Sequence, residues 1–229
     1  MRNPIWITEI VVADDGAAWR SAGFTVDDTN HAHIGAVRFH FVGREAQPKG
    51  GIVAWSVAGI SSAHDLDGLA TTVVNDASRA VPSDERDADV ARVEGLPTHR
   101  NSVTIVDHVV VATPDINRTI GQFVSVGMEP RRERLGGSEA HPMRQVFLRA
   151  GEVIIEVVGP PVAPNDARIR ERRASFYGLA FSCADLDACA ALLGDGVGTI
   201  RDATQPGRRI ATLRHDQFGI SVPTVLMTE

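Results

Sequence analysis

The sequence predicts an α+β protein built from three copies of one strand–helix–strand–strand–strand (βαβββ) module. Three stretches of the chain repeat this order of elements, and short β-branched runs of strand length outnumber helical patterns. In each copy the helix follows the first strand and begins at an Asp or Thr capping signal. We expect a degenerate N-terminal module at 1–60, an irregular linker at 61–102, a middle module at 103–160 and a C-terminal module at 161–229.

The middle copy shows this order most clearly. An apolar strand at 104–112 is followed by Thr113-Pro114-Asp115, which predicts a helix with Thr113 as N-cap and Pro114 in the first helical position. Apolar residues then recur at helical spacing up to Gly127, which ends the helix. Strands are expected at 128–135, 143–149 and 152–158, the last two joined by a tight turn at Ala150-Gly151.

The two flanking copies follow the same order. The first has strands at 5–13, 37–42 and 52–57, with a short helix at 17–20 after Asp14-Asp15-Gly16. The third has strands at 175–183, 197–202, 209–214 and 222–228, with a helix from about Asp185 to Gly194. A short helix around 84–93 is expected within the linker.

Composition excludes several classes of function. A chain of 229 residues with a net charge of -6 has no electrostatic footprint for nucleic acid or for a membrane surface. No apolar run approaches the roughly 18 residues of a membrane helix. The first residues lack a signal-peptide layout, so we expect a cytoplasmic protein. Two cysteines, Cys183 and Cys189, are too few for a disulfide framework and are expected to be buried thiols.

Two polar residues interrupt the apolar strands of the middle copy. His108 lies in the first strand and Glu156 in the last, and period-2 alternation places each beside half-buried apolar neighbours. A carboxylate in such apolar surroundings can act as a general base, so we interpret Glu156 and His108 as catalytic residues that line a cavity. The alternative is that the pair only satisfies buried polar groups.

Further residues are candidates for contact with a ligand. Gly178, Ala180 and Ser182 share one face of their strand, and small side chains there leave volume for a ligand or allow close packing. Gln145, Phe147 and Arg149 share one face of another strand, and an arginine there could pair with an anion. His31-Ala32-His33 has the spacing of two metal ligands on one strand face, or simply marks the start of a strand.

The copies can be aligned strand by strand. Residues 107–112 align with 8–13, which sets Glu9 opposite His108. Residues 153–158 align with 52–57, which sets Trp55 opposite Glu156. A metal site built from the first and middle copies would therefore use Glu9, His108 and Glu156, with Trp55 as a wall.

Three segments carry a resemblance to a known family: VDHVVVATPDI at 106–116, MRQVFLRAGEVIIEVVGP at 143–160 and YGLAFSCADLDACAALLG at 177–194. They resemble the vicinal oxygen chelate superfamily, which includes glyoxalase I, bleomycin-resistance proteins and extradiol dioxygenases. The resemblance covers 103–229 well and 1–60 weakly. It implies paired modules whose curved mixed sheets surround a cavity, with helices on the outer face and metal ligands on the first and last strands of each module.

The resemblance assigns ligand positions to His108 and Glu156 in the middle module, and to Gly178 and Leu226 in the third, or Thr224 in place of Leu226 if the strand is shifted by two residues. Glycine and leucine have no donor atoms in their side chains, so the resemblance implies an incomplete metal site and no cofactor. We therefore expect a glyoxalase-like small-molecule-binding protein, or a metal-free enzyme acting on a carbonyl-containing or anionic metabolite.

The alternative is a metal-dependent isomerase or lyase that uses Glu9, His108 and Glu156 with Zn, Ni, Mn or Fe. Three modules cannot all pair within one chain, so a homodimer is expected, with no nucleic-acid or membrane partner.

Overall fold

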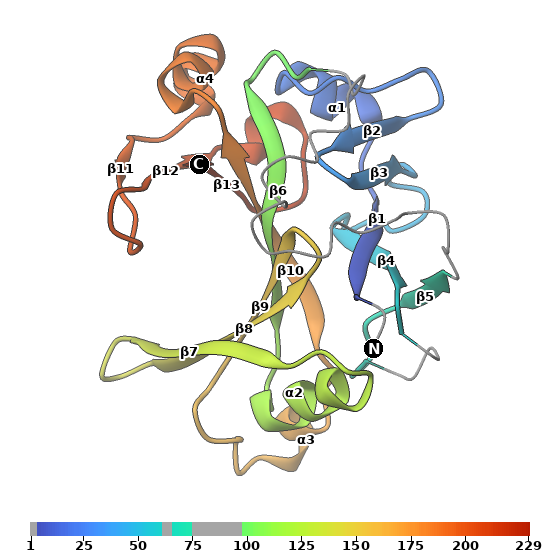
Figure 1. Ribbon diagram of the computed structural model, residues 1–229, viewed down its shortest axis with the longest axis vertical. Helices are drawn as coiled ribbons and strands as arrows, with labels where there is room; N and C mark the ends of the chain where they lie inside the picture. Colours follow the sequence, from blue (N-terminus) through green and yellow to red (C-terminus); the bar gives the residue numbers. More distant parts are fainter. Residues whose placement is uncertain (1–3, 61–65, 75–97) are drawn as a thin grey trace. The chain divides into compact units, whose positions relative to one another are not determined.

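The computed structural model describes residues 4–60, 66–74 and 98–229, and the predicted α+β class is confirmed (Figure 1). Strands of one mixed sheet are β1 (Trp6–Val12), β2 (His31–Ile34), β3 (Val37–Phe41), β4 (Ile52–Ala58) and β5 (Thr71–Val74), in the order β2-β3-β1-β4-β5. The second sheet has eight strands, in the order β11-β12-β13-β10-β6-β9-β8-β7. Their bounds are β6 (Val103–Ala112), β7 (Pro130–Gly137), β8 (Pro142–Ala150), β9 (Val153–Gly159), β10 (Ser175–Cys183), β11 (Arg201–Asp202), β12 (Arg209–Leu213) and β13 (Thr224–Thr228). The helix expected around 84–93 lies outside the described residues.

Three predicted helices are present, and short polar side chains cap each of them. Helix α1 (Gly16–Ser21) is capped by Asp15, and α4 (Leu186–Leu193) by Asp185. Helix α2 (Ile116–Ser125) is capped by Asp115, whose carboxylate accepts from the N–H of Arg118, so the expected cap at Thr113 is wrong. The hydroxyl of Thr113 instead accepts from the Asp115 N–H. A further helix, α3 (Ala167–Arg170), lies in the connector after the middle module.

The chain divides into two compact units, each described by itself. Unit 1 comprises residues 1–8, 54–80 and 108–177, and unit 2 comprises 9–53, 81–107 and 178–229. In unit 1, β6 runs parallel to β9, which pairs antiparallel with β8, which in turn forms a long antiparallel hairpin with β7 (Figure 1). Helix α2 packs against β9. This part of unit 1 is the middle βαβββ module.

The first copy pairs its strands differently from the other two. In the middle copy the fourth strand, β9, runs parallel to the first strand, β6, and in the third copy β13 runs parallel to β10. In the first copy the strand parallel to β1 is β3, while β4 lies on the other side of β1. The alignment that set Trp55 of β4 opposite Glu156 of β9 is therefore wrong, because β4 is not the strand equivalent to β9.

The core of unit 2 is a cluster of aromatic rings. Trp19 of α1 is fully buried and contacts Phe24, Phe39 and Phe41 at ring-centroid distances of 5.1, 5.9 and 5.0 Å. Phe181 of β10 joins the cluster edge-on, 6.2 Å from Trp19. Such rings bury large apolar areas and give the first and third copies a shared core. Cys183 and Cys189 are buried thiols near this core, as expected.

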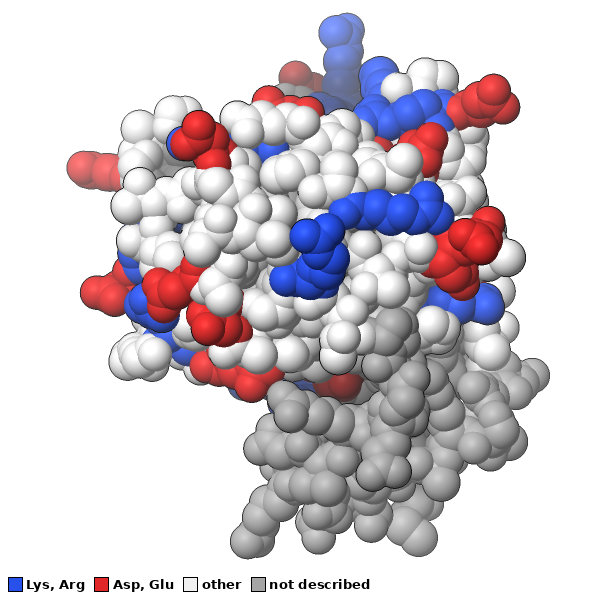
Figure 2. All heavy atoms as spheres, turned by 90° about the horizontal axis from the view of Figure 1, so that it is seen from above, with Lys and Arg blue, Asp and Glu red and all other residues white. Residues whose placement is uncertain are grey.

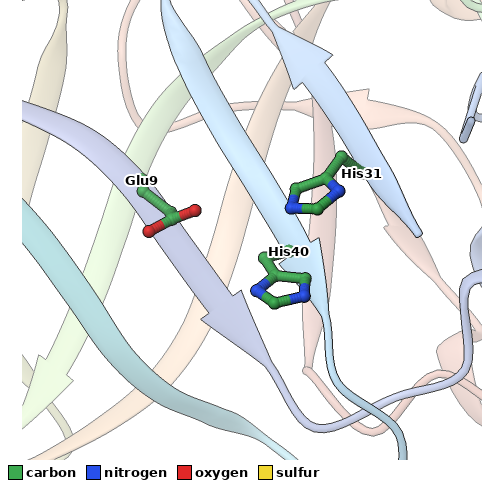
Figure 3. Close-up of side chains that lie close together, drawn as sticks. All are labelled: Glu9, His31 and His40. Carbon is green, nitrogen blue, oxygen red and sulfur yellow. The ribbon is translucent and has the colours of Figure 1, made fainter. Parts of the chain in front are cut away.

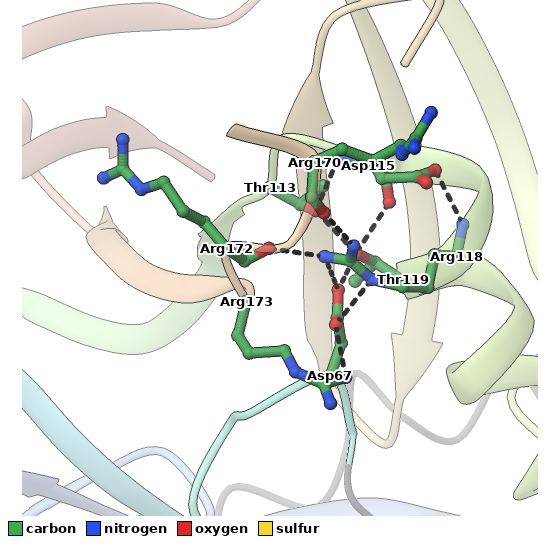
Figure 4. Close-up of polar contacts among 8 residues, drawn as sticks. All are labelled: Asp67, Thr113, Asp115, Arg118, Thr119, Arg170, Arg172 and Arg173. Carbon is green, nitrogen blue, oxygen red and sulfur yellow. Dashed lines mark hydrogen bonds and ion pairs between the residues drawn. The ribbon is translucent and has the colours of Figure 1, made fainter. Parts of the chain in front are cut away.

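A buried carboxylate anchors the start of α2 in unit 1. Asp67 is fully buried, and its carboxylate accepts from Nε and Nη2 of Arg118 at 2.8 and 3.1 Å and from the Thr119 hydroxyl at 2.5 Å (Figure 4). Arg118 also donates to the carbonyls of Arg170 and Arg172. The network fixes the first turn of α2, the helix that packs on the strand carrying Glu156.

Charged residues of both signs are interspersed on the surface. On the face in Figure 2, Lys and Arg side chains lie among Asp and Glu side chains. This arrangement agrees with the net charge of -6. Within the described ranges, no helix has the length and apolar character needed to span a membrane.

Candidate functional site

One face of the middle module is only partly covered, and we call it the open face. The opposite face is apolar and buried, with Val109, Val111, Ile155 and Val157 at or near zero exposure. On the open face the strand registers align half-buried residues across four strands. A sheet face that carries both polar and apolar half-buried side chains is a surface suited to a ligand.

Four polar side chains form a row across the open face, one from each strand. The Nε–H of Arg134 (β7) donates to Oε1 of Gln145 (β8) at 2.7 Å. The Nε2–H of Gln145 donates to Oε1 of Glu156 (β9) in a short hydrogen bond. The other carboxylate oxygen of Glu156 lies 3.3 Å from Nε2 of His108 (β6). We call Arg134, Gln145, Glu156 and His108 the polar row.

The donors and acceptors of this row fix its chemistry. A guanidinium can only donate, so it fixes the carbonyl of Gln145 toward Arg134 and the amide N–H₂ toward Glu156. The first oxygen of Glu156 must therefore accept, which leaves the second oxygen to share a proton with His108. The side chains of His108 and Glu156 are 19% and 11% exposed, so the pair is near the surface of the sheet but largely shielded from water. A carboxylate–imidazole pair of this kind can hold or transfer one proton.

Apolar side chains flank the polar row. By register, Phe147 lies opposite Glu156, and Val110 lies beside it on the next strand. Both are half-buried, as are Ile154 and Val158. The structure therefore brings three of the predicted residues, His108, Gln145 and Glu156, into direct contact.

Arg149 lies in register with Ile154 on the same strand pair, but it is exposed, and its Nε–H donates to the carbonyl of Gly151. The arginine in the polar row is instead Arg134. The sequence alone did not distinguish Arg134 from the other arginines of the chain. The missing signal was the register between β7 and β8, which pairs Arg134 with Gln145.

The small residues predicted on β10 are buried in unit 2. Gly178 and Ala180 are fully enclosed, and Ser182 is 2% exposed. The hydroxyl of Ser182 accepts from Arg208 at 3.0 Å, and Arg208 also forms a 2.7 Å ion pair with Asp107. Since this hydroxyl already has partners, Ser182 contributes to a structural contact between β10 and the strand end that carries Arg208.

The register also corrects the residue matched to Glu156 in the third copy. In the middle copy Val110, two residues after His108, pairs with Glu156. Ala180, two residues after Gly178, pairs with Val225, so the match to Leu226 is wrong by one residue. Leu226 points to the opposite face and is 1% exposed. Valine also lacks donor atoms, so the third copy still offers no side-chain ligand at either position.

The same register reasoning identifies a residue that was missed in the first copy. Val11, two residues after Glu9, pairs with His40 of β3, so His40 occupies the position of Glu156. Glu9, His40 and the neighbouring His31 offer ligand atoms within 4.8 Å of one another (Figure 3). Glu9 thus lies with two histidines of unit 2, and the metal set of Glu9, His108 and Glu156 stays a prediction. The alternation of 37–41 was the available signal, because it places His40 and Arg38 on one face.

The strand order and the helix positions are those of an α+β protein with βαβββ modules. The model of the glyoxalase/bleomycin resistance protein/dioxygenase superfamily matches residues 107–212, which include His108, Glu156 and the first strand of the third copy. This match agrees with the resemblance found in the sequence, and it covers most of the middle module and part of the third.

Solved structures that match part of this chain include methylmalonyl-CoA epimerase from Mycobacterium tuberculosis, at 24% identity, covering 56% of this chain and 89% of that one, with a TM-score of 0.41. The enzyme of the same name from Streptomyces coelicolor, solved with 2-nitronate-propionyl-CoA, is 24% identical over 56% of this chain and 96% of that one, with a TM-score of 0.39. A hypothetical protein from Bacillus halodurans is 17% identical over 54% of this chain and 93% of that one, also with a TM-score of 0.39. Comparison with curated proteins finds no match.

Proposed function

We propose that this protein binds a small carbonyl-containing or anionic organic molecule on the open face and transfers a proton with Glu156 and His108. The observation that supports the proposal most directly is the polar row, in which the proton-sharing pair is held by Gln145 and Arg134. A general base must lie within reach of the proton it removes, and this pair lies on a partly exposed sheet face.

Each member of the row has a separate task. Glu156 accepts a proton from a carbon next to a carbonyl group, and His108 carries the exchanged proton or donates it back. Gln145 keeps the carboxylate turned toward His108. Arg134 places a positive charge at the end of the row, and an anionic group of the ligand can pair with it. Phe147 and Val110 contact the apolar part of the ligand.

The proton transfer can be tested by deuterium exchange. Pyruvate and 2-oxobutyrate, incubated with the protein in D₂O, should gain deuterium on the carbon next to the carbonyl. Proton NMR measures this exchange as loss of the signal from that carbon's protons. Removing a general base typically slows a reaction by about 10²–10⁴-fold, so Glu156→Gln should slow exchange by about that factor. Saturation-transfer NMR should show that the variant still binds the probe, because Gln keeps the shape of Glu.

The control is Glu133→Gln, which removes an exposed carboxylate on β7 and should leave the exchange rate unchanged. Equal exchange rates in Glu156→Gln and in the unsubstituted protein would contradict the assignment of Glu156 as the base. Absence of probe binding to the unsubstituted protein would contradict the proposed ligand class.

This proposal assigns the proton transfer to side chains of the chain itself. A divalent ion (Zn, Ni, Mn or Fe) bound by His108, Glu156 and Glu9 is the alternative. Elemental analysis of protein grown with each metal distinguishes the metal-free proton transfer from the metal-dependent alternative. A full equivalent of metal that is lost in both His108→Gln and Glu9→Gln would favour the alternative.

We also expect the protein to form a homodimer. Strand β7 is the last strand of its sheet, so no other strand of the described residues pairs with its outer row of backbone groups. The hairpin of β7 and β8 also exposes apolar side chains, with Leu135 at 70% and Met143 at 38% exposure. A second copy would cover both features, and light scattering that shows a monomer would contradict this expectation.

A further inference from the structure

A second polar cluster lies on the first sheet, in unit 2. Glu9 of β1, His31 of β2 and His40 of β3 are half-buried, and their ligand atoms all lie within 4.8 Å of one another. Figure 3 shows the three side chains on neighbouring strands, with the Glu9 carboxylate pointing toward the histidine rings. The cluster belongs to a different unit from the open face, and the proposed proton transfer does not use it.

Strand register explains why the three side chains meet. His31 and His40 are direct cross-strand partners, and their rings stack at 4.3 Å with an interplanar angle of 13°. Glu9 is paired with Arg38, two residues from His40, so its carboxylate is diagonal to the imidazole. The intervening residues of these strands, Ile10 and Phe39, are fully buried on the opposite face. The cluster is therefore held by a rigid sheet.

A hydrogen-bond chain also orients the ring of His31. The Asp27 carboxylate accepts from the backbone N–H of His31 and from the Thr29 N–H and hydroxyl, at 2.8–2.9 Å. These bonds, the one from the His31 backbone first, hold the pKa of Asp27 below its usual value. The Thr29 hydroxyl donates its proton to this carboxylate, so its oxygen accepts from Nδ1–H of His31 at 3.0 Å. That tautomer leaves the lone pair of His31 on Nε2.

We propose that Glu9, His31 and His40 form a binding site for one divalent transition-metal ion of the Zn²⁺ type. Two imidazoles and a carboxylate are ligands of the kind that Zn²⁺ and Co²⁺ take, and three of them leave a fourth position for water. A histidine ligand whose other nitrogen is bonded to a neighbouring group is the usual arrangement around such ions, and Thr29 and Asp27 provide it for His31. Tetrahedral ligands at about 2.0–2.1 Å from an ion lie about 3.3 Å apart, so the ligand atoms must move closer together and the stacked rings must turn for their lone pairs to meet at one ion.

Arg38 opposes this binding. The guanidinium of Arg38 forms a 2.8 Å ion pair with Glu9, and the Arg38 side chain is 49% exposed. A metal ion must compete with this arginine for the carboxylate and is repelled by its charge. We therefore expect Arg38→Gln to increase metal affinity, by roughly three- to tenfold for an interaction screened by water.

The test is a titration of the untagged, metal-free full-length chain with Co²⁺, followed by visible absorption. One equivalent should produce the d–d bands of a four- or five-coordinate ion, and Zn²⁺ should abolish them by competition. His40→Phe keeps a ring that can stack on His31 but removes a ligand, so it should weaken binding by at least about tenfold. Thr29→Val should weaken binding by roughly tenfold, because it removes the support for His31.

His33→Gln is the matched control, since His33 lies on the same strand and face as His31 but faces Arg38 across the strands. It should leave Co²⁺ affinity unchanged, as should Glu156→Gln in the open face. Unchanged binding in His40→Phe, a comparable loss in His33→Gln, or no saturable d–d bands in the unsubstituted chain would each overturn the proposal. The result is independent of the deuterium-exchange test, because the two experiments read different units of the chain.

Discussion

Replacing Asp67 by Asn tests how strongly the buried network at α2 supports the module that carries Glu156. The substitution keeps the size of the side chain, removes its charge and replaces one of its two acceptor oxygens by an N–H₂ donor. Asn also tolerates the left-handed backbone of this position, where φ is +55°. Removing one partner of a buried ion pair costs about 3–5 kcal/mol. Arg118 is 25% exposed and keeps its bonds to two carbonyls, so we expect a loss of about 2–3 kcal/mol.

The assay is urea unfolding, with tryptophan fluorescence as the probe. Trp55 is a useful reporter because its ring is fully buried and contacts Phe123 of α2 at a centroid distance of 6.2 Å. Glu133→Gln serves as the control, since its ion pair with Arg144 lies at the surface and should have little effect on the midpoint. A loss below about 1 kcal/mol in Asp67→Asn would refute the inference that the network anchors the helix.

Three further predictions concern protonation, the polar row and assembly. Burial lowers the pKa of His99 below its usual 6.5, so the folded chain binds fewer protons there than the unfolded chain. The free energy of unfolding should therefore fall as pH drops below about 6.5, and His99→Gln should reduce that fall in urea titrations at several pH values. Gln145→Leu removes the hydrogen bond that turns Glu156 and should slow deuterium exchange by about tenfold without loss of the probe's saturation-transfer signal. Leu135→Asp places a charge on the exposed hairpin, so light scattering should show a monomer for this variant and the proposed dimer for the unsubstituted protein.

Much of the middle module could be predicted from the sequence. Alternation along β6, β8 and β9 predicted the face of its own strand on which each of His108, Gln145 and Glu156 lies. In the structure these three faces form one face of the sheet. The hairpin turn at Gly151 set the register between β8 and β9, so the contact of Gln145 with Glu156 followed from local signals. The family match covers the same residues.

The pairing of strands in the first copy could not be predicted in the same way. Period-2 alternation shows which residues share a face of one strand, but it does not show which strand becomes the neighbour. Ile52–Ala58 has the composition of a last strand, yet β3 takes the place parallel to β1. The partner is decided by burial of the aromatic core, where Phe39 and Phe41 reach Trp19. That long-range contact leaves no local signal in the sequence.

The strand register shows that the three copies carry different residues at equivalent positions, so each copy can support a different chemistry. The first-strand and last-strand positions hold Glu9 and His40 in the first copy, His108 and Glu156 in the middle copy, and Gly178 and Val225 in the third. Of the two copies whose strands form the eight-stranded sheet, only the middle copy has side-chain donors at these positions. Two protein donors rarely retain an ion, whereas two donors that share a proton are sufficient for acid–base chemistry. In the first copy His31 supplies the third donor from the adjacent strand, and a metal site there needs no contribution from another module.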